Sequence, residues 1–131
     1  GIFAYASDYG QFDHSYASGS PDSGFYIGQC DPCHSVIDDV IATDNAAGFS
    51  GTNASVDLSI VNSEWYGTLA GIVPNPLDSE LLPPQHDGVF AGNYVHDNGN
   101  PGAPTLALNA KVRWLTQASE PPRSADTARS S

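Results

Sequence analysis

Three polar segments of this chain hold the residues that could act on a sugar: residues 28–34, 51–57 and 74–88. Glycoside hydrolysis needs two carboxyl groups at a controlled separation, one protonated and one ionised. The third segment supplies Asp78 and Glu80, and Asp31 or Asp57 from the other segments could complete the pair. His86 adds a group that could abstract a proton. These five residues are the candidate catalytic residues, and each is otherwise an ordinary solvated loop residue.

The same segments hold amide side chains, which suit the hydroxyl groups of a sugar because an amide both donates and accepts hydrogen bonds. Aromatic rings add a stacking surface, and Tyr66 is the candidate for that role, whereas Trp65 fits the interior better. The candidate substrate-binding residues are Gln29, Asn53, Asn75, Gln85 and Tyr66.

A mixed nitrogen and oxygen metal site is a second chemistry. Asp31, His34, His86 and Asp87 could bind Zn²⁺ or Cu²⁺ if their segments meet, with Asp87 and His34 as the metal candidates. The spacing is not diagnostic, and a histidine on a polar loop is ordinarily just solvated. No cofactor is required by the pattern, and Ca²⁺ is compatible with its many oxygen ligands.

Cys30 and Cys33 form a Cys-Asp-Pro-Cys-His sequence, which matches the attachment motif of c-type haem. The chain has no Met, so the second axial ligand would have to be another histidine. The surrounding residues favour strands and turns, whereas helices are expected around a c-type haem. A local disulfide or a pair of free thiols is the favoured interpretation.

The charge distribution excludes some partners. Residues 1–110 contain no Lys or Arg but hold 13 of the 15 acidic residues, and the four basic residues all follow. A body of this charge repels phosphate backbones and anionic membranes, so neither nucleic acid nor a membrane is expected as a partner. Cations and neutral glycans remain compatible with it.

An internal repeat determines the expected fold. A Gly followed by two mostly apolar residues recurs at Gly1, Gly24, Gly48 and Gly71, with spacings of 23, 24 and 23 residues. The segments between are short, β-branched or aromatic, and bounded by Gly, Pro, Asn and Asp, which favours strands. A unit of this length accommodates about three short strands and their turns.

Aligning the repeats predicts ladders of equivalent residues, because equivalent strands of successive coils pair in parallel. One ladder is apolar and holds Phe12, Ile37, Ile60 and Phe90. A second apolar ladder holds Ala17, Ala42, Trp65 and Val95. A third ladder, of Asn45, Thr68 and Asn98, falls at a turn. The recurring Gly suits a tight corner, where φ is positive or a side chain would clash.

The stretches Gly24-Phe25-Tyr26-Ile27-Gly28-Gln29-Cys30, Gly48-Phe49-Ser50-Gly51-Thr52-Asn53 and Ala70-Gly71-Ile72-Val73-Pro74-Asn75 resemble bacterial secreted right-handed parallel β-helix repeat proteins of the pectate-lyase-like group. The resemblance implies an all-β fold, a short right-handed parallel β-helix of about four to five coils. It also implies a secreted or cell-surface location in a bacterium. Such proteins usually have more coils, so we expect the chain to be truncated.

The resemblance further implies polysaccharide elimination, with Ca²⁺ bound by acids and an Arg or Lys as the base. That base has no counterpart in residues 1–110, so the lyase activity is less favoured than hydrolysis. His86 could replace the base only as a departure from the family pattern.

The repeat fades before residue 110, and residues 110–131 switch to Ala, Arg, Ser and Pro. We therefore expect a β-helix domain over residues 1–109 and a disordered or non-native tail over 110–131. A short solenoid exposes apolar coil faces at its ends, which predicts a homo-oligomer formed through those ends.

The sequence thus predicts a carbohydrate-active protein that hydrolyses or binds a polysaccharide along the loop-lined flank of a solenoid. The alternative is a non-catalytic structural or adhesion module that binds cations, since a fold alone does not determine a function.

Overall fold

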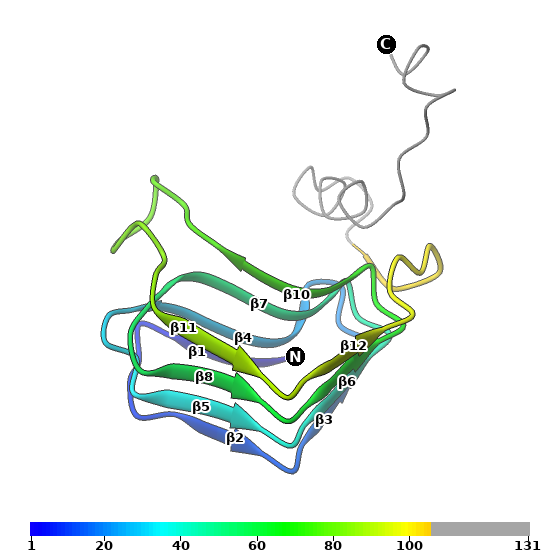
Figure 1. Cartoon of the computed structure of the whole chain (residues 1–131). Helices are drawn as coiled ribbons and strands as arrows, with labels where there is room; N and C mark the ends of the chain where they lie inside the picture. Colours follow the sequence, from blue (N-terminus) through cyan, green and yellow to red (C-terminus); the bar gives the residue numbers. More distant parts are fainter. Residues whose placement is uncertain (106–131) are drawn as a thin grey trace.

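The computed structural model describes residues 1–105, and Figure 1 shows that these residues form strands joined by turns, with no helix among them. The twelve strands are β1 (Ile2–Tyr5), β2 (Gln11–Asp13), β3 (Tyr16–Ser18), β4 (Ser23–Cys30), β5 (Ser35–Asp38), β6 (Ile41–Thr43), β7 (Ala47–Ala54), β8 (Leu58–Val61), β9 (Glu64–Tyr66), β10 (Ala70–Asn75), β11 (Gly88–Ala91) and β12 (Tyr94–His96). No helix in this part of the chain is long and apolar enough to cross a membrane.

The strands form three parallel sheets of four strands each. Sheet A has the order β1-β4-β7-β10, sheet B the order β11-β8-β5-β2, and sheet C the order β12-β9-β6-β3. The chain therefore visits the three sheets in turn and makes about three full turns between β1 and β10 (Figure 1). This confirms the predicted all-β class and the parallel β-solenoid.

The predicted apolar ladders are confirmed by the strand register. Phe12 pairs with Ile37, Ile37 with Ile60, and Ile60 with Phe90. Ala17, Ala42, Trp65 and Val95 pair in the same successive manner. Each residue of a ladder therefore contacts its equivalents in the neighbouring coils, and the apolar side chains of the middle coils form one continuous core.

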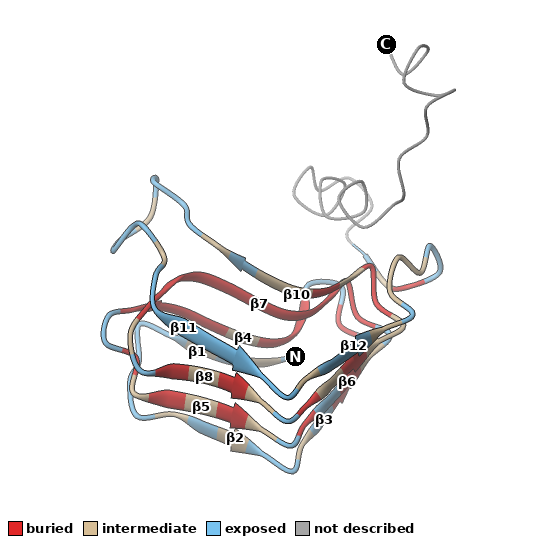
Figure 2. Cartoon of the chain, viewed as in Figure 1, coloured by how far each residue is buried: buried red, intermediate tan, exposed pale blue. Residues whose placement is uncertain are grey.

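Aromatic rings fill the centre of this core, which Figure 2 shows in red along the middle coils. Phe25, Phe49 and Trp65 are fully buried. The ring of Trp65 meets Phe25 and Phe49 edge-on, with centroid distances of 6.0 and 6.3 Å. Edge-to-face packing of this kind is favourable beyond the area it buries. The placement of Trp65 inside the solenoid was correctly predicted.

A polar ladder closes the corner between sheets C and A. The side chain of Asn45 accepts a hydrogen bond from the Ser20 amide at 2.9 Å and donates one to the Ala17 carbonyl at 3.1 Å. Asn98 bonds to the amide of Thr68 and the carbonyl of Trp65 in the same way. Buried turn groups thus find partners in the next coil, as buried polar groups require.

Positive φ angles occur at the corners rather than at the recurring glycines. His14, Asp39, Asn62 and Gly92 hold this conformation between sheets B and C, one residue in each coil. The recurring glycines are needed for a different reason, close approach. A Cβ on Gly48 would lie 2.5 Å from the Gly71 carbonyl oxygen and 3.0 Å from the Trp65 ring.

The uppermost coil leaves part of its apolar surface uncovered. Phe90 and Val95 are 37% and 47% exposed, whereas their ladder partners Ile60 and Trp65 are buried. The association of copies through such coil ends stays a prediction. The predicted tail, residues 110–131, lies outside the described residues, as does the domain boundary at 109.

Replacing Gly48 by Ala tests the stacking. The added methyl group would overlap the backbone of the next coil, and overpacking of this kind costs about 1–3 kcal/mol of unfolding free energy. Gly10→Ala is the matched control, since its Cβ would meet only the Ser35 hydroxyl, at 3.3 Å. Urea unfolding followed by circular dichroism measures both variants, and equal midpoints would contradict the close-packing argument.

Candidate functional site

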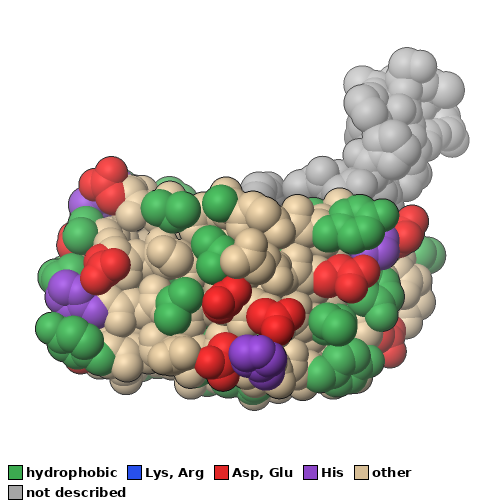
Figure 3. Space-filling view, turned by 60° about the horizontal axis from the view of Figure 1, so that its bottom comes forward, with side chains coloured by type: hydrophobic (Ala, Val, Ile, Leu, Met, Phe, Trp, Pro, Cys, Tyr) green, Lys and Arg blue, Asp and Glu red, His purple; other side chains and the backbone are tan. Residues whose placement is uncertain are grey.

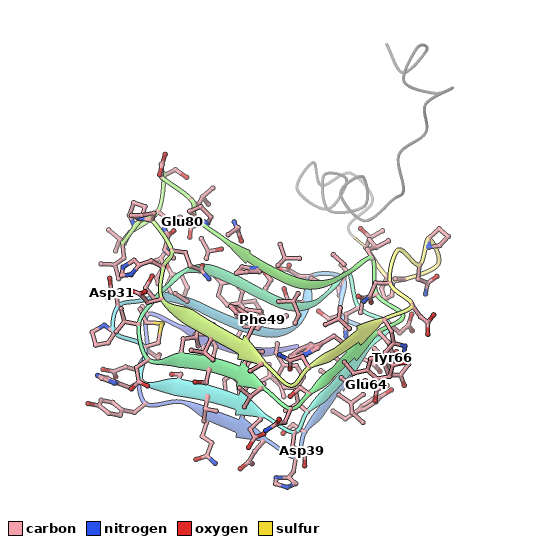
Figure 4. All side chains as sticks on the ribbon, in the orientation of Figure 1. Asp31, Asp39, Phe49, Glu64, Tyr66 and Glu80 are labelled. Carbon is pink, nitrogen blue, oxygen red and sulfur yellow. A yellow bond between two sulfur atoms is a disulfide. The ribbon has the colours of Figure 1, made fainter. Side chains whose placement is uncertain are left out.

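The connection from sheet A to sheet B is much longer in the last coil than in the others. It spans residues 76–87, whereas the earlier connections span residues 6–10, 31–34 and 55–57. This long loop folds back along the flank toward the second coil. Figure 4 shows Glu80 and Asp31 on this same flank, with Glu64 and Tyr66 on the opposite side of the molecule.

Two residues with positive φ angles anchor the long loop. Gln29 and Asn53 follow the register partners Gly28 and Thr52, so they occupy equivalent places in β4 and β7. The Asn53 side chain donates to the carbonyls of Leu77 and Leu81 at 2.9 and 2.8 Å, and accepts from the Leu77 amide at 2.9 Å. Twelve other non-glycine residues of the described chain also have a positive φ, so this pair is distinguished by its hydrogen bonds to the long loop.

Gln29 positions the candidate acid Glu80. Its side-chain amide donates a hydrogen bond of 2.8 Å to Glu80 Oε2. This contact joins the second coil to the long loop of the fourth coil. The Glu80 carboxylate is therefore held in place, whereas Asp78 in the same loop is exposed.

The end of the long loop is held by the third and second coils. Gln85 accepts a hydrogen bond from the Ala54 amide at 3.3 Å, and the Ser55 hydroxyl accepts one from the His86 amide at 3.0 Å. The His86 ring lies between two carboxylates, with 2.8 Å to Asp87 and 3.3 Å to Asp31. The hydrogen bonds to Asp87 and then Asp31 raise the pKa of His86.

The outer face of sheet A borders this loop and carries both aromatic and polar groups. Tyr26 lies flat over Gly28, where a Cβ would overlap its hydroxyl group, and its ring contacts Phe3 at a centroid distance of 4.9 Å. Burial raises the pKa of Tyr26, and the nearby Glu80 carboxylate adds to the effect, while a hydrogen bond with Thr52 opposes it. Tyr26 therefore stays a neutral hydroxyl group beside Glu80.

Asn75 pairs in register with Thr52 on this face. Its side-chain oxygen Oδ1 is buried and has no hydrogen-bond partner among residues 1–105. A buried acceptor without a donor costs about 1–3 kcal/mol, so such atoms are rare and call for an explanation. On the same face, Phe3 and Tyr5 are more than half exposed.

Two open pockets flank the long loop. One, of about 290 Å³, lies beside the first two coils and is lined by Ala6, Ser7, Asp8, Gln29, Cys30, Asp31, Pro32 and Leu82. The other, of about 250 Å³, is lined by Pro74, Pro76, Gln85, His86, Asp87, Gly88 and Phe90. The first pocket holds the candidates Gln29 and Asp31 of the second coil, and the second holds Gln85, His86 and Asp87 of the long loop. Neither pocket is enclosed.

The remaining candidates make their side-chain contacts with other partners. His34 contacts Asp57 at 2.7 Å and stacks on Tyr9, with the ring centroids 4.6 Å apart. Tyr66 lies on sheet C, stacked on His96. Within residues 1–105, no group of three or more His, Cys, Asp or Glu side chains is arranged to hold a metal ion.

Sequence reasoning missed a second histidine–carboxylate group, on the outer face of sheet C. His96 contacts Asp97 and Glu64, each at 2.7 Å, and its ring lies against both Tyr66 and Tyr94. The hydrogen bonds to Asp97 and then Glu64 raise the pKa of His96. The repeat alignment could have found this group, since Tyr94 and His96 are the register partners of Glu64 and Tyr66.

Cys30 and Cys33 form a disulfide, and both residues are almost fully buried. This agrees with the favoured interpretation and leaves no thiol for haem attachment at this motif. Asn53 begins an Asn-Ala-Ser sequence that matches the N-glycosylation pattern. Its side chain is buried and fully hydrogen-bonded, so it has no room for a glycan.

Comparison of the chain with protein-family models, with curated proteins and with solved structures finds no match in any of the three. The fold and the site define a parallel β-solenoid with one loop-bordered face. The case for its function therefore rests on that geometry.

The two raised histidine pKa values predict a pH-dependent stability. A histidine whose pKa is higher in the folded chain than its ordinary 6.5 stabilises the fold fully below that value. This stabilisation is lost as the pH rises through the raised pKa. The thermal midpoint should thus be higher at about pH 6 than at about pH 8. His86→Gln and His96→Gln should each reduce this difference, and a pH-independent midpoint in the unaltered chain would contradict the prediction.

Asn53→Ala tests the loop anchor. It removes the partner of three backbone groups of the loop, which costs about 1–3 kcal/mol and should speed amide hydrogen exchange at residues 77–81. Asn62→Ala is the matched control, because Asn62 has the same φ of about 50° but makes only one side-chain hydrogen bond, to Asp38. Similar exchange in both variants would show that Asn53 does not hold the loop.

Proposed function

We propose that this protein binds a polysaccharide on the outer face of sheet A, beside the long loop. The observation that carries the proposal is a face that combines exposed aromatic rings with the carboxylate of Glu80, which the anchored long loop brings to its edge. Glu80, held in place by Gln29, adds a carboxylate that can accept hydrogen bonds from the hydroxyl groups of a sugar. Phe3 and Tyr5 offer exposed rings on the same face, and ring faces suit the apolar side of a sugar.

Binding is favoured over hydrolysis by the surroundings of the candidate acids. A hydrolase keeps one carboxyl group protonated in a shielded cleft, with a second carboxylate across the glycosidic bond. Asp31 and Asp57 are engaged by histidines, and Glu80 is engaged by Gln29. Asp78 is exposed, and the pockets beside the loop are open. Elimination ranks lower still, since residues 1–110 contain no Lys or Arg to act as the base.

We further propose that the chain belongs with the bacterial, pectate-lyase-like β-helix proteins and acts outside the cell or at its surface. The parallel solenoid supports the likeness, and the Cys30–Cys33 disulfide supports an oxidising compartment. The competing function is a non-catalytic structural or adhesion module that binds cations such as Ca²⁺ through its many carboxylates.

Tyr5→Ala tests the binding face. Tyr5 is 57% exposed on sheet A, and Tyr94 is 63% exposed on sheet C, so Tyr94→Ala is a matched control. Isothermal titration against a panel of neutral, amino and acidic oligosaccharides should identify a ligand. Tyr5→Ala should weaken its binding by about fivefold to tenfold, because the stacking surface is lost, and Tyr94→Ala should leave it unchanged.

The same panel separates the competing functions. Release of reducing ends that disappears in the Asp78→Asn, Glu80→Gln double variant would establish hydrolysis and overturn the purely binding role. Unchanged binding in Tyr5→Ala would place the ligand elsewhere on the solenoid. Failure of every oligosaccharide to bind would favour the structural or adhesion module.

A further inference from the structure

The binding face is rich in acceptors and poor in positive charge. Glu80 brings a carboxylate to the edge of this face, near Tyr26. No Lys or Arg occurs in residues 1–110. His86 is the one histidine of the long loop, and both of its ring nitrogens already contact carboxylates, those of Asp87 and Asp31.

We infer that the ligand is a polysaccharide of amino sugars with free, protonated amines, and that Glu80 is the residue that selects the ammonium group. This inference rests on the proposed function and adds the substrate class. It goes beyond the likeness to pectate-lyase-like proteins, since an acidic polysaccharide would bring further negative charge to a face that cannot neutralise it.

Glu80 is prepared for a charged partner by its contact with Gln29. The amide of Gln29 occupies Oε2 only, which leaves Oε1 for a ligand. The same contact fixes the side chain, so little of its freedom remains to be lost when a ligand binds. A hydrogen bond between an ammonium group and a carboxylate is about twice as strong as one between neutral groups.

The other groups of the face suit the rest of an amino sugar. Tyr26 remains a neutral phenol, because burial raises its pKa, and it can donate to a ring oxygen. Phe3 and Tyr5 offer ring faces, which attract both apolar C–H groups and cations.

The experiment compares three oligosaccharides of equal length at pH 6: one of glucosamine with free amines, one of N-acetylglucosamine and one of galacturonic acid. Isothermal titration with the whole chain should show that the free amine binds about tenfold to a hundredfold more tightly than its acetylated form. The galacturonate should bind most weakly.

Glu80→Gln assigns the preference to one residue. A glutamine can still accept the hydrogen bond of Gln29, so the loop stays anchored, and amide exchange at residues 77–81 verifies this. The variant should lose the preference for the free amine and keep its affinity for the acetylated form. Asp78→Asn is the matched control, because it removes one charge from the same loop at an exposed position and should keep the preference.

Two results would overturn the inference while the proposed function stands. The first is equal binding of the amine and the acetylated oligosaccharide. The second is that Glu80→Gln and Asp78→Asn lose the preference for the free amine to the same extent. This would mean that the ligand responds only to the total charge of the protein. If none of the three oligosaccharides binds, and no other glycan of the panel does, the proposed function itself is wrong.

Discussion

The register of the parallel stack is the constraint on which the rest of the structure depends. Side chains alternate between the two faces of a strand, so a slip of one residue would turn Ile37 and Ile60 from the core to the solvent. The close approach of Gly48 and Gly71 reinforces the register, since that approach leaves no space for a Cβ. Because the coils cannot slide, residues that are far apart in sequence hold fixed positions on one face.

Charge is the second constraint, because the solenoid must hold many carboxylates without Lys or Arg. Figure 3 shows carboxylates and histidines on the surface of the described residues, with no basic side chain among them. Each of the four histidines contacts a carboxylate from a different coil. The pairs are His14–Asp39, His34–Asp57, His86–Asp31 and His96–Glu64. Histidine thus supplies the partners of these carboxylates across the coils, and the raised pKa values of His86 and His96 make the contacts of those two residues dependent on pH.

Much of the fold followed from the repeat alone. The spacing of the glycines and the alignment of Phe12 with Ile37 gave the correct register, because identical positions must stack in a parallel solenoid. The recurring glycines were expected either to adopt a positive φ or to avoid a clash, and only the second reason holds for Gly48. Its φ is not positive, but the backbone of Gly71 lies too close for a Cβ. A sequence repeat shows that a position is restricted, but it does not show which backbone or neighbouring atom restricts it.

The sequence predicted which segments meet on one flank, but not how their side chains are arranged. Placing the polar segments on one flank brought Gln29, Asn53 and Glu80 together correctly, since the repeat fixes where each coil turns. The alignment does not contain side-chain directions. It therefore could not predict that Asp57 pairs with His34, or that Tyr26 forms a hydrogen bond with Thr52.

A repeat protein gains a unique site where one coil departs from the others. Here the departure begins at Pro74 and Asn75, at the end of β10, and the long loop follows at once. The three regular coils supply a rigid face and the anchors Gln29 and Asn53, which the loop uses to reach back over two coils. The unpaired oxygen of Asn75 lies at this junction. The one buried side-chain oxygen of residues 1–105 that lacks a hydrogen-bond partner therefore lies where the regular coils end and the long loop begins.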